Sequence, residues 1–204
     1  MRIIALEGNI GCGKSSVLAA LAGTCHTHAE PVQQWAPWLA RFDKREPGAA
    51  FGLQLRVLAS FHRAKQSWGS EGTVLVERSP HSGKNIFTAL MVEHGLLHTD
   101  EHELYTELYE KLSWTPTEHV YLRCSPELAL KRVHMRSREH EHAVDLAYLT
   151  ALHCKHEEQY ANAALVIDAS QPLDAVVAEL RRHVLGQDDA APPAVAPAST
   201  APPA

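Results

Sequence analysis

The sequence contains little cysteine. Its 204 residues include four cysteines, Cys12, Cys25, Cys124 and Cys154, which lie far apart and form no CxxC pair. Scattered single cysteines argue against a disulfide framework and against a cysteine-ligated zinc site. They favour free thiols in a reducing compartment.

Long apolar runs are also missing. No segment approaches the ~20 consecutive apolar residues that a membrane-spanning helix requires. Met1-Arg2 leads directly into a short apolar run, with no room for a signal or transit peptide. Together with the cysteine pattern, this predicts a cytoplasmic protein, with the nucleus as the alternative.

An excess of positive charge is lacking too. The formal net charge is -5, which argues against a nucleic-acid coat and against a polybasic membrane anchor. The hydrophobic share of 45% and the charged share of 21% are ordinary for a globular enzyme. We therefore expect neither nucleic acid nor a membrane as a partner.

The composition changes once, near the C-terminus. After Gly186 the chain reads Gln-Asp-Asp and then only Ala, Pro, Val, Ser and Thr. Such a segment buries too little to offset its ordering entropy, so residues 186–204 are predicted to form a disordered tail. Residues 1–185 show no internal repeat and have the size of one domain.

Strand-like and helix-like segments alternate along this domain. Apolar runs rich in β-branched residues predict buried strands at Ile3–Leu6, Thr73–Glu77, His119–Leu122 and Leu165–Asp168, with a weaker one at Cys25–Glu30. Helical spacing and capping residues predict helices at Ser15–Ala22, Phe51–Trp68, Glu101–Trp114, Leu146–Tyr160, from Pro126 and from Pro172. The alternation predicts an α/β fold of the P-loop NTPase type, a three-layer sandwich with helices on both faces of a five-stranded parallel sheet. Ligands bind at the carboxyl ends of the strands in such sheets.

A phosphate-binding motif follows the first predicted strand. Gly8 to Ser15 matches G-x-x-x-x-G-K-[ST] completely, with a strand before it and a helix after it. Glycines let backbone N–H groups turn toward phosphate oxygens, and the helix adds its positive N-terminal end. Lys14 is expected to pair with the outer phosphates of ATP, and Ser15 to ligate Mg²⁺. The predicted phosphate-binding residues are Gly8, Asn9, Ile10, Gly11, Cys12, Gly13, Lys14, Ser15 and Ser16.

Charged residues follow two further predicted strands. Glu30 precedes Pro31 and can act as a general base, although Glu-Pro is also a common turn. Glu77 and Arg78 end an apolar strand, where Glu77 can bind Mg²⁺ or its waters and Arg78 can stabilise a transferred phosphoryl group. A salt bridge at a strand end is the structural alternative for this pair.

An arginine-rich segment lies later in the chain. Arg132 and Arg136 share a helical face, with Arg138 close behind. Such a cationic edge can close over phosphates as a lid. A solvated charged helix is the alternative.

In this order the motifs LEGNIGCGKSS, EPVQQW, FGLQ, ERSPHSGKNIF, YLRCSPELALKRVHMRSREHE and DLAYLTALHCKHE resemble the eukaryotic and viral deoxynucleoside kinases. The resemblance covers about residues 2–170 and implies ATP-dependent phosphorylation of a nucleoside 5′-hydroxyl. It implies that Glu30 is the catalytic base, that Arg78 lies near the 5′-oxygen and that Glu141 holds the 3′-hydroxyl. It also implies a base pocket formed by Trp35, Phe42, Gln54, Val57, Phe61, Gly83 and Phe87. Arg132, Arg136 and Arg138 match the lid, and Asp168 falls where this family encloses adenine.

Two residues predict which base is accepted. Deoxycytidine-type kinases resemble one another in carrying arginine and aspartate at the positions of Phe61 and Gly83. Without that ion pair, Gln54 better matches the N3–H and O4 edge of thymine, so we expect a pyrimidine preference with thymidine best and a role in nucleotide salvage. Leu53 and Phe42 depart from the phenylalanine and tyrosine usual in this family, which affects sugar contacts and affinity.

Other functions compete with this hypothesis. Thymidylate kinases share the phosphate motif but need additional cations for the acceptor's own phosphate, whereas the acceptor side here offers Glu30 and Gln54. A non-catalytic relative with a structural role would be signalled by loss of Lys14, Glu30 or Arg78, and all three are present. The fourteen histidines suggest a metal hydrolase as another alternative, but the sequence contains no HExxH motif. The resemblance also implies a homodimer, for which Glu101–Trp114 offers one face.

Overall fold

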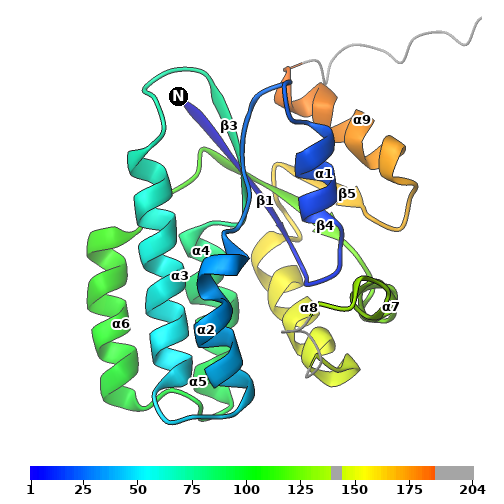
Figure 1. The fold of residues 1–204 in the computed structure, drawn as a ribbon. Helices are drawn as coiled ribbons and strands as arrows, with labels where there is room; N and C mark the ends of the chain where they lie inside the picture. Colours follow the sequence, from blue (N-terminus) through cyan, green and yellow to red (C-terminus); the bar gives the residue numbers. More distant parts are fainter. Residues whose placement is uncertain (139–143, 187–204) are drawn as a thin grey trace, which may run out of the picture.

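The computed structural model describes residues 1–138 and 144–186. Its centre is a parallel sheet of five strands in the order β2-β3-β1-β4-β5 (Figure 1). The strands are β1 (Arg2–Gly8), β2 (His26–His28), β3 (Thr73–Glu77), β4 (Glu118–Arg123) and β5 (Leu165–Asp168). This confirms the predicted α/β fold, including the weak second strand, which is shorter than expected.

Alternate residues of the central strand point to opposite faces of the sheet. Ile4 and Leu6 belong to the large core that includes residues of α1 (Lys14–Ala20) and α9 (Leu173–Val184). Ile3 and Ala5 instead pack with Ala64 and Trp68 at the end of α3 (Ala49–Gln66). Both faces are therefore covered, as the near-continuous apolar strand sequences require.

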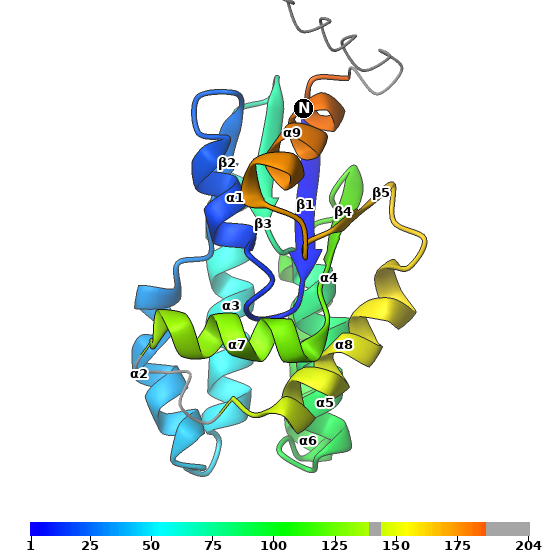
Figure 2. The same cartoon turned by 90° about the vertical axis from the view of Figure 1, so that its right-hand side faces the viewer.

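The remaining helices are α2 (Val32–Asp43), α6 (Thr99–Leu112), α7 (Pro126–Arg136) and α8 (Leu146–Tyr160). Seen from the side, α7 crosses below the carboxyl end of β1, with α8 beside it (Figure 2). Ser125 and Asp145 cap these two helices as predicted, accepting hydrogen bonds from Leu128 N at 3.3 Å and Tyr148 N at 2.8 Å. No helix in the described ranges is long and apolar enough to cross a membrane.

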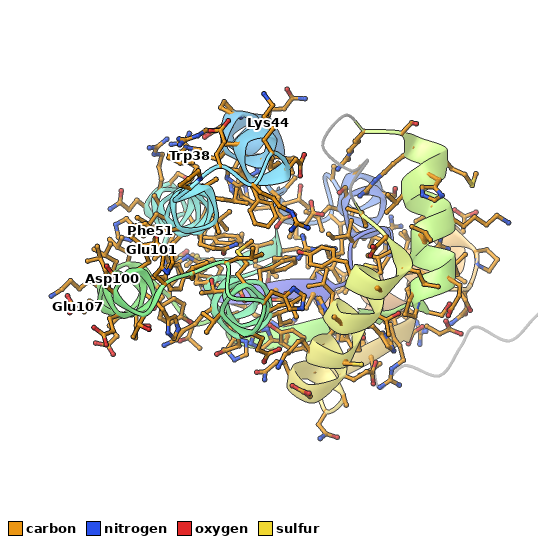
Figure 3. All side chains as sticks on the ribbon, turned by 90° about the horizontal axis from the view of Figure 1, so that it is seen from below. Trp38, Lys44, Phe51, Asp100, Glu101 and Glu107 are labelled. Carbon is orange, nitrogen blue, oxygen red and sulfur yellow. The ribbon has the colours of Figure 1, made fainter. Side chains whose placement is uncertain are left out.

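A helical segment that the sequence did not predict follows β3. It runs through α4 (Pro80–Ser82), the π-helical turn η1 (Gly83–Thr88) and α5 (Ala89–Glu93). Viewed from below, α2, α3 and α6 lie near this segment at one side of the molecule, with Asp100 and Glu107 on the outer side of α6 (Figure 3). A π-helical turn frequently marks a functional site, because it changes the direction of the side chains that follow.

A buried histidine lies between α8 and the sheet. His156 is fully buried, its Nδ1 lies 2.7 Å from the Leu152 carbonyl oxygen, and its ring stacks against Tyr121. Burial lowers the pKa of His156 to about 3, and the positive charges of Arg78 and Lys14 act in the same direction. The folded protein therefore holds this imidazole neutral.

This burial predicts acid sensitivity. The unfolded chain protonates His156 below its ordinary pKa of about 6.5, whereas the folded chain does not, so stability falls as the pH decreases. Between pH ~6.5 and pH ~5 this residue alone should remove about 2 kcal/mol of unfolding free energy. Urea denaturation of wild type and His156→Leu at both pH values measures the difference.

The unfolding free energy of His156→Leu should depend less steeply on pH than that of wild type. His134→Gln provides the control, because His134 is exposed on α7 and should leave the dependence unchanged. If the unfolding free energies of wild type and His156→Leu change equally with pH, the acid sensitivity belongs to other groups.

Candidate active site

A cleft of about 1640 Å³ lies where the strands end. The phosphate loop, α2, α3, η1 and α8 contribute to its walls. The loop needs glycine for two reasons. Gly11 has a φ of +83°, and a Cβ there would lie 2.4 Å from the Ala129 carbonyl oxygen. Any side chain at Gly11 would therefore displace the loop from α7.

The loop lysine is buried beneath this loop. Lys14 Nζ donates to the carbonyl oxygens of Gly8 at 2.9 Å and Asn9 at 2.8 Å. These two bonds curl the loop around the ammonium group at the first turn of α1. A cation at a helix N-terminus, ringed by backbone N–H groups, is the arrangement that binds phosphate in proteins.

A hydroxyl and a carboxylate meet beside the loop. Ser15 Oγ donates to Glu77 Oε1 at 2.9 Å, and the other Glu77 oxygen lies 3.4 Å from the backbone nitrogen of Glu30. Both side chains offer hard oxygen donors. Mg²⁺ prefers such oxygens and is usually held by one or two protein groups together with substrate phosphates, so Ser15 and Glu77 fit this ion.

A carboxylate and a guanidinium pair at the centre of the cleft. Arg78 Nη1 donates to Glu30 Oε2 at 2.6 Å, and both side chains are 9% exposed. Arg78 also donates to the Gly8 carbonyl oxygen at 3.3 Å, and its guanidinium lies 4.8 Å from the centre of the Phe87 ring. Its φ of +60° is unusual for a residue with a side chain and directs Arg78 from the strand end toward the loop.

The two charges influence each other's protonation. Burial raises the pKa of Glu30, and the Arg78 guanidinium opposes that rise without cancelling it. The pKa of Arg78 is raised by the negative charges of Glu30 and Glu77, against the opposing effect of burial. The site therefore holds a permanent cation beside a carboxylate that is more basic than usual.

The predicted base pocket forms the apolar side of the same cleft. Trp35 and Phe61 are buried and meet edge to face at 6.4 Å between ring centres, and Trp35 Nε1 donates to Ser60. Gln54 is buried beside them. Phe42, Val57, Gly83 and Phe87 also line the cleft. The structure thus brings together residues from α2, α3 and η1 that are distant in the sequence.

Most, but not all, of the predicted phosphate-site residues in the described ranges line the cleft. Ile10, Ser16, Arg136 and Arg138 line the cleft, as do the loop residues Gly11, Gly13, Lys14 and Ser15. Five of the predicted phosphate-site residues in the described ranges do not line the cleft: Gly8, Asn9, Cys12, Arg132 and Asp168.

Three of these residues have other contacts. Asn9 Nδ2 donates to the Leu149 carbonyl oxygen at 2.8 Å and ties the loop to α8. Arg132 donates to the Cys12 carbonyl oxygen at 3.4 Å, and Asp168 accepts from the Ser170 nitrogen at 2.8 Å. Glu141 is outside the described residues.

Sequence reasoning overlooked one buried carboxylate. Glu7 is fully buried at the end of β1, and Ser79 Oγ donates to its Oε1 at 2.7 Å. Burial raises the pKa of Glu7, but His119, 3.5 Å away, and Ser79 hold it below its ordinary value. The bond joins the residue before Gly8 to the residue after Arg78 and so fixes the loop relative to the arginine. The sequence did carry a signal for Glu7, namely a charged residue at the end of an apolar strand.

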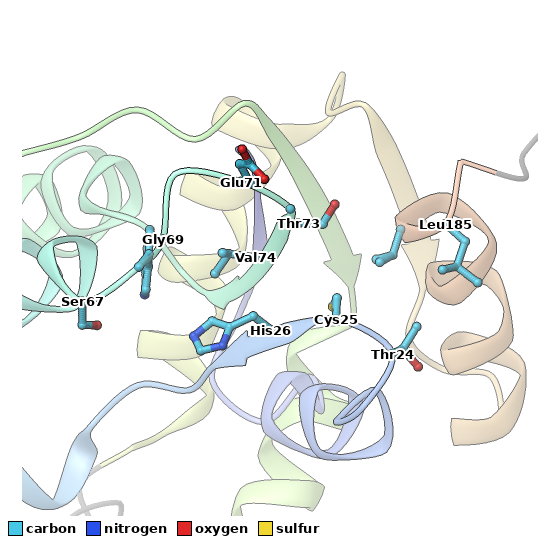
Figure 4. Close-up of a pocket in the computed structure, with 12 residues that line it drawn as sticks. Thr24, Cys25, His26, Ser67, Gly69, Glu71, Thr73, Val74 and Leu185 are labelled. Atoms are coloured by element: carbon cyan, nitrogen blue, oxygen red, sulfur yellow. The ribbon is translucent and has the colours of Figure 1, made fainter.

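A second hollow lies at the opposite ends of the strands. It measures about 520 Å³ and is bordered by residues such as Cys25, His26 and Thr73 (Figure 4). Those residues sit where β2 and β3 begin. Because ligands of parallel α/β sheets gather at the carboxyl ends, the larger cleft is the candidate active site.

Comparison with known proteins identifies the family of the chain. A family model described as deoxynucleoside kinase matches residues 4–185. A protein of Invertebrate iridescent virus 3 named as a candidate kinase, 029R, is 34% identical over 85% of this chain and 91% of its own. The thymidine kinase of Ictalurid herpesvirus 1 is 30% identical over 89% and 87%.

A solved structure shares the fold. Deoxyadenosine kinase from M. mycoides, determined with dCMP and a flexible dCDP, has a TM-score of 0.80 at 20% identity, covering 90% of this chain and 99% of its own. The family model spans nearly all of the described residues, and the relatives align over most of their lengths. The chain therefore belongs to the deoxynucleoside kinase family and is a phosphotransferase that acts on ATP and nucleosides.

Proposed function

We propose that this kinase phosphorylates the 5′-hydroxyl of deoxyribonucleosides, prefers thymidine and serves nucleotide salvage. The Glu30–Arg78 pair between the phosphate loop and the aromatic pocket carries the reaction part of the proposal. A nucleoside whose base lies between Trp35 and Phe87 would present its 5′-oxygen to this pair. The γ-phosphate of ATP on the loop would approach from the other side.

In this mechanism Glu30 accepts the proton of the 5′-hydroxyl. The 5′-oxygen then forms a bond to the γ-phosphorus while the bond from that phosphorus to the bridging oxygen breaks, and ADP leaves. Arg78 and Lys14 stabilise the charge on the migrating phosphoryl group, and Arg136 and Arg138 close over it. The raised pKa of Glu30 suits a general base, because proton transfer is most efficient when that pKa approaches the working pH.

Ser15 and Glu77 would hold Mg²⁺ together with ATP. When bound, Mg²⁺ supplies positive charge to the outer phosphates. The protein's own part is to keep the two oxygens together, 2.9 Å apart, at the first turn of α1.

The thymidine preference rests on the uncharged surroundings of Gln54. Its side-chain partners are the Thr88 hydroxyl and the Met91 sulphur, and Phe61 and Gly83 bring no charge. An exocyclic amine would therefore find no ionic partner beside the glutamine. Gly83 lines the cleft and adds no side chain to it, whereas a Cβ there would already be in van der Waals contact with the Tyr105 hydroxyl at 3.8 Å.

A nucleoside panel tests this assignment. Purified protein with ATP should show its highest kcat/KM with thymidine, followed by deoxyuridine and deoxycytidine, with both purine deoxynucleosides slower. Thymidine monophosphate, included as an acceptor, tests the thymidylate kinase alternative. Faster turnover of a purine deoxynucleoside than of thymidine at equal concentration would refute the thymidine preference.

The homodimer implied by the resemblance stays a prediction. Leu104 on α6 is 45% exposed, and Leu96 just before that helix is 39% exposed. Leu104 offers apolar surface on the predicted Glu101–Trp114 face, whereas Leu96 lies outside that range.

A further inference from the structure

The orientation of the Gln54 amide is set by two neighbours on one helical segment. Thr88 Oγ1 donates to Gln54 Oε1 at 3.2 Å, and Gln54 Nε2 donates to Met91 Sδ at 3.4 Å. Thr88 ends η1 and Met91 lies in α5, three residues later. This spacing places both side chains on the same side of the segment, facing α3.

The chemistry of the two partners is asymmetric. A thioether sulphur accepts hydrogen bonds weakly and has no proton to donate, whereas a hydroxyl can donate. The amide NH₂ therefore faces Met91 and the amide oxygen faces Thr88. Turning the amide over would place its oxygen against the sulphur lone pairs, and a buried acceptor without a donor is costly.

Tyr105 lies behind this arrangement. It is 1% exposed on α6, and the Thr88 side chain lowers the pKa of its phenol against the larger opposing effect of burial. Burial raises the pKa of Tyr105 to about 12, so the phenol keeps its proton. Tyr105 is therefore a neutral, buried neighbour of Thr88.

The fixed amide presents a defined pattern to the base. One lone pair of Oε1 and one hydrogen of Nε2 remain for a ligand. Thymine offers a donor at N3 and an acceptor at position 4, whereas cytosine offers an acceptor at N3 and a donor at position 4. For the same placement of the ring, the two bases require opposite orientations of the amide.

We propose that Thr88 is a specificity-determining positioning residue, which fixes the amide of Gln54 through one hydrogen bond and thereby separates 4-keto from 4-amino pyrimidines. The proposal rests on the proposed function in taking Gln54 as the residue that contacts the base. Met91 supports the same orientation from the other side of the amide.

Steady-state kinetics of Thr88→Val test this role, because valine keeps the branched shape and loses the hydroxyl. The ratio of kcat/KM for thymidine to that for deoxycytidine should move toward unity by about fivefold, the equivalent of one neutral hydrogen bond. KM for ATP should stay unchanged. Thr88→Ser restores the hydroxyl and should restore the wild-type ratio.

The outcomes separate this proposal from the thymidine assignment. A ratio in Thr88→Val that stays within about twofold of wild type would overturn the role of Thr88. If Thr88→Val folds poorly, Thr88→Ala also removes the hydroxyl and should narrow the ratio in the same way, and an unchanged ratio in Thr88→Ala would overturn the role of Thr88. If wild type favours deoxycytidine and Thr88→Val widens that preference, the thymidine preference fails while the positioning role stands.

Discussion

Glu30→Gln should lower kcat for nucleoside phosphorylation by roughly 10²–10⁴-fold, the usual contribution of a positioned general base. Glutamine keeps the size of the side chain and an oxygen that can accept from Arg78, but it cannot take a proton. The bond of 2.6 Å to Arg78 should therefore survive in altered form, and the pocket should keep its shape. KM for ATP should change little, because Glu30 lies on the acceptor side.

The pH profile gives this prediction a second readout. Only the ionised carboxylate is active as a base, so wild-type kcat/KM should fall as the pH decreases through the pKa of Glu30. Burial places that pKa above the ordinary glutamate value of about 4.3, which moves the acidic limb to higher pH. The limb should be absent from Glu30→Gln.

Glu107→Gln is the matched control, because Glu107 is exposed on the outer side of α6 (Figure 3). It should keep wild-type kcat. If Glu30→Gln loses less than tenfold in kcat, another group must take the proton, and the proposed mechanism would have to be abandoned.

Lys14→Ala should lower kcat/KM for ATP by roughly 10²–10³-fold, the range found when one preorganised donor to developing charge is removed. The ammonium group is buried under the phosphate loop and has no substitute at that position. Its two bonds to the carbonyl oxygens of Gly8 and Asn9 would also be lost. We expect the loop to be less well organised as well as less positive.

Nucleoside binding distinguishes a local defect from general unfolding. Lys14 serves the donor side, so titration with thymidine in the absence of ATP, followed by tryptophan fluorescence, should give a dissociation constant close to that of wild type. Lys131→Ala, at an exposed position of α7, is the control for loss of a lysine. Wild-type activity in Lys14→Ala would contradict phosphate binding by this loop.

Much of the fold follows from local patterns in the sequence. Four apolar runs became β1, β3, β4 and β5 with small shifts at their ends, and Ser125 and Asp145 cap their helices as predicted. These features depend on periodic burial and on helix capping, and both are set by residues that are close together in the chain. The helix α2 was missed because Pro31 and Pro37 are strong helix-breaking signals, yet Pro31 only precedes α2 and Pro37 lies inside it.

The sequence by itself determined the phosphate loop, because the Gly8–Ser15 motif encodes its turns through glycine at fixed spacing and ends on the lysine and serine that phosphate and metal need. It also indicated Glu30, Glu77 and Arg78 as charges ending strands. Only the tertiary structure decided that Glu30 pairs with Arg78, that Glu7 holds Ser79, and that Thr88 and Met91 orient Gln54. The physical reason is that these contacts join different strands and helices, whose relative positions depend on the packing of the whole sheet.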